Sequence, residues 1–113
     1  MTTPAITGFH AHVYFDAATR ERAWALRERV GETFADRVVV GRFHERPVGP
    51  HPRWSFQIAF APAAVDLVVP WLMLNRDGLT VFLHPETGDA LGDHADRAAW
   101  MGELLPLNLD ALR

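Results

Sequence analysis

The sequence contains no cysteine, and this absence excludes several kinds of chemistry. Disulfides, thiolate catalysis, iron–sulfur clusters and zinc sites with thiolate ligands all require that residue. Histidine and carboxylate are then the only strong metal ligands left, and they suit a hard or borderline metal best. Six histidines are available for this purpose among 113 residues.

The sequence also lacks an excess of basic residues and a long apolar run. A net charge of -3 gives no basic surface for nucleic acid or for an anionic membrane. The longest apolar stretch, residues 61–74, is interrupted by Asp66 and Pro70 and is too short to span a bilayer. The amino terminus has no basic segment followed by an apolar core. We therefore expect a cytoplasmic protein that acts on a small molecule, without nucleic acid or membrane as a partner.

Nothing in the sequence divides the chain. It has no repeat, linker or low-complexity segment, so residues 1–113 should form one domain. A chain of this length buries about two thirds of its unfolded surface and can fold without a structural metal. A bound metal would therefore serve chemistry rather than folding.

Most of the histidines stand at constrained positions. Residues 9–15 alternate between apolar and polar side chains, which predicts a strand with His10 and His12 on one face. Prolines restrict the backbone around His51 and beside His84. A rigid backbone is what a coordination shell needs, so the pattern predicts a metal site.

Each histidine also has a less specific explanation. A single histidine is more often a surface or hydrogen-bonded residue than a metal ligand. His94 follows Asp93, whose carboxylate either orients the imidazole ring or caps the following helix. The metal-site hypothesis depends on several histidines coming together.

The periodicity of apolar residues predicts an alternating series of elements. Strands are expected at residues 9–15, 38–43, 53–60 and 79–83, helices at residues 17–33 and 62–74, and a short helical stretch at residues 95–101. This order predicts an α+β fold of the ferredoxin-like split βαβ type, with a four-stranded antiparallel sheet and two helices on one face. The first strand would lie between the third and the fourth. The free sheet face would then collect His10, His12, Tyr14, Ser55, Gln57 and His84.

The same residues belong to a longer set of motifs. These are His-Ala-His-Val-Tyr-Phe at residues 10–15, Pro-Val-Gly-Pro-His-Pro at residues 47–52, Pro-Trp-Leu-Met-Leu-Asn-Arg at residues 70–76, Leu-His-Pro-Glu-Thr-Gly at residues 83–88, Asp93-His94, and Trp-Met-Gly at residues 100–102. Together they cover nearly the whole chain, and they resemble the DOPA 4,5-dioxygenase family. The resemblance implies a small ferredoxin-like protein, often dimeric, whose fungal members cleave the catechol ring of L-DOPA with non-haem Fe(II) and dioxygen. The family's histidine motifs fall on His10, His12, His44, His51, His84 and His94.

Extradiol ring cleavage needs Fe(II) held by a few imidazoles, or by imidazoles and one carboxylate, with open positions for a catechol and O2. We expect His12, His51 and His84 to be the metal ligands, with Glu45 as the alternative carboxylate. The predicted catalytic residues are His10, His94 and His44, with His10 or His94 in the proton-transfer role. The predicted substrate contacts are Arg53, Tyr14 and Gln57.

Two other functions fit the same residues. One is a non-catalytic dimeric module that binds an aromatic ligand on the histidine-lined face. The other is a cofactor-independent small monooxygenase. The free sheet face also predicts a homodimer with the active site at or near the interface.

Overall fold

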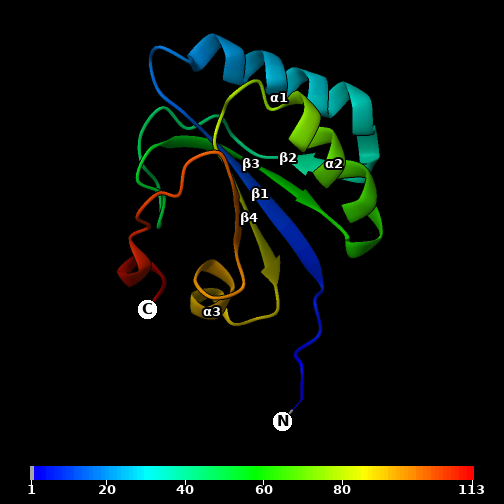
Figure 1. The fold of residues 1–113 in the computed structure, drawn as a ribbon, viewed down its shortest axis with the longest axis vertical. Coiled ribbons are helices and arrows are strands. Elements are labelled where there is room, and N and C mark those ends of the chain that lie inside the picture. The colour runs from blue at the N-terminus through cyan, green and yellow to red at the C-terminus, as the bar shows by residue number, and fades with distance from the viewer. Residues whose placement is uncertain (1) are drawn as a thin grey trace.

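One antiparallel sheet of five strands organises this α+β protein (Figure 1). The computed structural model describes residues 2–113. The strands are β1 (Gly8–Phe15), β2 (Val38–Val40), β3 (Trp54–Phe60), β4 (Val81–Glu86) and β5 (Ala99–Met101), in the order β2-β3-β1-β4-β5. β1 therefore lies between β3 and β4, as the sequence predicted, and it is the strand around which the site is built.

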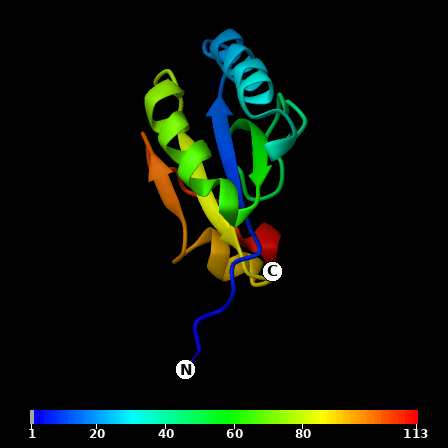
Figure 2. The ribbon, with the colours of Figure 1, turned by 90° about the vertical axis from the view of Figure 1, so that its right-hand side faces the viewer.

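Two long helices cover one face of this sheet. They are α1 (Arg20–Phe34) and α2 (Val65–Asn75), and Figure 2 shows both on the same side of the sheet. α1 begins at Arg20 rather than at Ala17 because Asp16 and Thr19 form a turn before it, in which the Thr19 amide donates to Asp16 Oδ1 at 2.9 Å. A 3₁₀ turn at Pro62–Ala64 leads into α2.

The hydrophobic core lies between the sheet and these two helices. Alternate residues of β1 and β3 point towards the helices, as predicted. The fully buried side chains of this layer include Ala11, Val13, Phe56, Ile58, Leu26, Val30, Val68 and Leu72. The intervening residues of the same strands face the other way, so one strand contributes both to the core and to the opposite face.

Two predicted features of the fold are wrong. The sheet has a fifth strand, and α3 (Ala90–His94) adds a third helix. Residues 95–101 do not form a helix, because the helix starts earlier, where Asp89 caps it by accepting a hydrogen bond from the Gly92 amide at 3.1 Å. Residues 99–101 instead extend the sheet by pairing with residues 81–83 of β4.

The face opposite α1 and α2 is partly covered by the carboxyl-terminal part of the chain. Leu105 and Leu107 pack there with Tyr14, Phe82 and Trp100 in a second apolar cluster. This cover could not be predicted, because an irregular segment has no periodicity. Within residues 2–113, no helix is both long and apolar enough to cross a membrane.

Candidate metal centre

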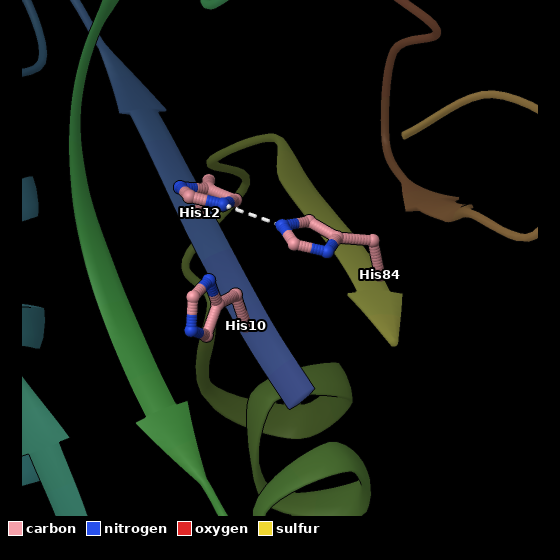
Figure 3. A group of neighbouring side chains, drawn as sticks. All are labelled: His10, His12 and His84. Atoms are coloured by element: carbon pink, nitrogen blue, oxygen red, sulfur yellow. Dashed lines mark hydrogen bonds between the residues drawn. The ribbon is translucent and has the colours of Figure 1, made fainter. Parts of the chain in front are cut away.

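Three histidines from two neighbouring strands meet on the sheet face that α1 and α2 leave free (Figure 3). His10 and His12 lie two residues apart on β1, and His84 lies opposite His10 on β4. One ring nitrogen of each side chain lies within 4.8 Å of those of the other two. We call His10, His12 and His84 the histidine triad.

The two buried members of the triad have the spacing of metal ligands. His12 and His84 are 5% and 1% exposed, and their Nε2 atoms are 3.0 Å apart. The Nδ1 atom of His84 donates to the Pro85 carbonyl oxygen at 3.0 Å, so Nε2 keeps its lone pair. Metal–imidazole bonds of about 2.1 Å place neighbouring ligands roughly 3 Å apart. The two Nε2 atoms are therefore well placed to hold one cation.

Two further histidines flank the triad. The ring of His51 lies 4.1 Å from that of His12, and the ring of His94 lies 3.9 Å from that of His84, measured between centroids. In His94, Nδ1 donates to the Ala90 carbonyl oxygen at 2.7 Å, so its Nε2 has a lone pair that can accept a proton or bind a metal. Five imidazoles are thus gathered from two strands, one loop and α3.

His51 is tied to Tyr14. Its Nδ1 atom and the Tyr14 hydroxyl are 2.6 Å apart, and burial raises the pKa of Tyr14, which keeps the phenol neutral. His51 can bind a metal through Nε2 only when Nδ1 donates its hydrogen to the phenol oxygen. The predicted ligand role of His51 therefore depends on one tautomer, whereas His84 is already held in the ligating form.

Burial keeps His12, His51 and His84 neutral. It lowers the pKa of His51 and of His84 to about 4, with the neighbouring His94 acting in the same direction on both. Burial and then the adjacent imidazoles hold the pKa of His12 well below its usual range. A neutral imidazole is the form that donates a lone pair to a metal, so at neutral pH these rings are ready to bind one.

The low histidine pKa values predict acid-sensitive folding of the metal-free protein. Between pH 6.5 and 4, His51 and His84 bind protons in the unfolded chain but stay neutral in the folded chain, where they are buried. The free energy of unfolding should therefore fall as the pH is lowered through this window. We expect a loss on the order of 2 kcal/mol or more by pH 4.5, measured by urea unfolding. His51→Gln should show a shallower pH dependence, and a stability that is constant from pH 7 to 5 would contradict the prediction.

A carboxylate that was not among the predicted site residues borders the triad. Glu86 Oε1 lies 2.9 Å from His10 Nδ1 and 3.7 Å from His84 Nδ1. Burial lowers the pKa of His10, and the charge of Glu86 acts against that shift. The sequence held a signal for this residue, because Glu86 follows His84 by two positions on the same strand and so shares its face.

We expect Glu86 to support metal binding. Glu86→Gln keeps the size and the hydrogen-bonding capacity but removes the charge, and should weaken Co(II) or Zn(II) binding by roughly tenfold, as for other groups that orient ligating histidines. Competition with a chelator measures this. The matched control is Glu45→Gln, whose carboxylate is held by Arg20 at 2.7 Å; equal loss in both variants would rule out a specific role for Glu86.

Asp93 is buried and does not hold the His94 ring. Its carboxylate accepts hydrogen bonds from the Thr87 amide, the Thr87 hydroxyl and Arg97, at 2.8, 2.7 and 3.0 Å. Burial opposes ionisation of Asp93, but these hydrogen bonds together lower its pKa. Asp89, not Asp93, is the helix cap. Asp93 therefore fastens α3, which carries His94, to the end of β4.

Other predicted site residues are distributed around this centre. Gln57 lies directly opposite His12 on β3, and His44 pairs with Ser55 at the edge of the same face. The alternative ligand Glu45 is exposed and bound by Arg20, so it does not join the triad. Arg53 is engaged by Glu103 through two hydrogen bonds of 3.2 and 3.3 Å.

The fold and the triad define a small α+β protein with a largely buried histidine centre suited to a metal. The chain belongs to the Dopa 4,5-dioxygenase family, whose model matches residues 9–111. This confirms the resemblance seen in the motifs.

Known proteins agree with this assignment. The chain is 37% identical to an uncharacterised 21.2 kDa protein of Botryotinia fuckeliana, over 93% of this chain and 63% of that protein. It is 36% identical to DOPA 4,5-dioxygenase of Amanita muscaria, over 92% of this chain and 49% of that protein. The chain thus spans about half to two thirds of these relatives. A crystal structure from Nostoc punctiforme, provisionally described as a dioxygenase, is 54% identical with a TM-score of 0.91, covering 95% of this chain and 91% of that one.

Proposed function

We propose that the protein is an extradiol dioxygenase, which opens the ring of a catechol such as L-DOPA with O2 and with Fe(II) held by the histidine triad. The observation that carries this proposal is the convergence of three histidine ring nitrogens within 4.8 Å in a member of this family. The name of the Amanita muscaria relative supports dioxygenase chemistry. The metal, the position of ring opening and the catechol are parts of the proposal.

The donor set fits Fe(II). Imidazole is a borderline ligand that suits iron, and no thiolate is present to favour a softer metal. When bound, Fe(II) would supply open coordination positions at which a catechol and O2 meet. The geometry favours His10 over the predicted His51 as the third ligand, with His12 and His84 common to both sets.

The chain's own residues would handle protons and water. The free Nε2 of His94 stands beside the triad and is our choice to accept a proton from a catechol hydroxyl. Burial lowers the pKa of His51 to about 4, so this ring is a poor proton acceptor at neutral pH. Phe82 and Trp100, whose rings are 4.5 Å apart, form an apolar wall that limits access of water.

Two structural proposals accompany this function. We propose that the fold is ferredoxin-like with β5 added at one edge, which is supported by the order of the other four strands. We also propose a homodimer. The chain's own carboxyl-terminal segment covers part of the face that motivated it, but β2 is a sheet edge with Val39 70% exposed. Sedimentation at micromolar concentration should give twice the monomer mass, and a monomer that keeps its activity would contradict the proposal.

Anaerobic reconstitution with Fe(II), followed by O2 and a panel of catechols, tests the function. We expect oxygen uptake together with a yellow ring-opened product, and loss of both after chelation. Activity that survives chelation would favour the cofactor-independent monooxygenase. Binding of aromatic ligands without turnover, and without metal binding by the triad, would favour the non-catalytic module.

A further inference from the structure

A cavity of about 340 Å³ opens beside the histidine triad, at the ends of β1, β3 and β2. It shares His10 with the triad. Strand pairing places His10, Ala59 and Val39 in one row across the three strands, and alternation turns that row to the triad's face of the sheet. Gly8 and Ala59 in its lining have little or no side chain, which leaves a hollow over the sheet backbone.

The rim of this cavity carries a free cation. Arg37 and Asp36 line it from the 3₁₀ turn between α1 and β2. Among residues 2–113, neither side chain makes a hydrogen bond or an ion pair with another described residue, whereas Arg53, the arginine predicted to bind substrate, is occupied by Glu103. A guanidinium that no other described residue engages, at the rim of a cavity that extends to His10 of the triad, is suited to bind an anionic group.

We propose that this cavity is a substrate subsite, in which Arg37 binds the carboxylate of a catechol side chain while the catechol hydroxyls face the histidine triad. The proposal rests on the proposed function for the position of the ring. Arg37 would then determine specificity by distinguishing carboxylate-bearing catechols from uncharged ones. Asp36 on the same rim tolerates an ammonium group near the carboxylate and disfavours a second anion.

A pair of substrates tests the subsite. 3,4-Dihydroxyphenylpropionate carries a carboxylate, and 4-methylcatechol has the same ring without charge. Arg37→Leu should raise KM for the first by roughly tenfold or more, the size expected for loss of one charge-assisted hydrogen bond, and should leave KM for the second unchanged. Arg37→Lys should restore part of the difference. Arg29→Leu, which removes the same charge from α1 in the helix layer, is the matched control.

A measurement without turnover separates this inference from the proposed function. 3-Phenylpropionate has the carboxylate but no hydroxyls, and titrating it into metal-free protein should shift the amide signals of Ala59 and Val39 in wild type and not in Arg37→Leu. If neither catechol is cleaved, the proposed function fails while this titration still tests the subsite. An equal KM increase for both catechols, an unchanged KM for both, or identical titrations of wild type and variant would overturn the subsite. Sedimentation of Arg37→Leu verifies that the assembly is unaltered.

Discussion

If the proposed function holds, His84→Ala should lose nearly all bound iron and reduce turnover by at least roughly 10²-fold, because the variant removes a proposed ligand whose ring is fixed on both sides. Its Nδ1 is held by the Pro85 carbonyl oxygen and its Nε2 faces His12 at 3.0 Å. Removing a group that only orients a metal ligand typically lowers metal affinity or activity by about 10- to 100-fold. Removing a ligand itself should lower both by more. Iron content by elemental analysis and oxygen uptake measure the two effects.

The fold should survive this substitution. The main core lies between the sheet and the two long helices, and His84 is outside it, so circular dichroism should be unchanged. The matching variants His10→Ala and His51→Ala decide the third ligand. Loss of iron in His10→Ala with retention in His51→Ala would support the triad, and the reverse would support the predicted set of His12, His51 and His84. Full iron occupancy in His84→Ala would disprove both.

His94→Ala should keep its iron but turn over roughly 10²-fold more slowly, the usual cost of losing a positioned proton-transfer group. The ring lies against His84 with Nε2 free and is not a member of the triad. One limb of the pH profile of turnover should disappear with it. Steady-state kinetics across pH, combined with iron analysis, makes the measurement.

Asp93→Asn is the informative comparison for His94→Ala. It weakens the contacts with Thr87 and Arg97 that fasten α3, so it should destabilise the protein by about 1 to 3 kcal/mol. His94 is partly exposed, so His94→Ala should change stability little. Normal turnover in His94→Ala would exclude the proton-transfer role for His94, and His10 would be the remaining candidate only if His10→Ala keeps its iron.

The sequence was most informative where a regular period and a simple topology act together. The alternation of residues 9–15 placed His10 and His12 on one face, and the expected position of β1 between β3 and β4 brought His84 next to them. The sequence could not predict in which direction the ring of a histidine in a loop points. His51 lies beside the triad but is committed to Tyr14, a contact that depends on how residues 44–52 return to the sheet.

Short and irregular segments account for the other differences. β5 has only three residues, too few to show a period, and its identity as a strand comes from pairing with β4. Glu86 was not among the predicted site residues, although it lies two residues beyond His84 on the same strand. Asp93 has neither of its two expected roles, orienting the His94 ring or capping the following helix, because its hydrogen bonds reach back to Thr87 and forward to Arg97.

β1 supplies core residues and triad residues in strict alternation, and this constrains how the chain can change in length. Inserting or deleting one residue between Phe9 and Val13 would exchange the two faces of the strand beyond that point. Imidazoles would then enter the apolar layer under α1 and α2, while Ala11 or Val13 would take their place beside His84. Substitutions can alter either face separately, but the length of this strand is fixed by both at once.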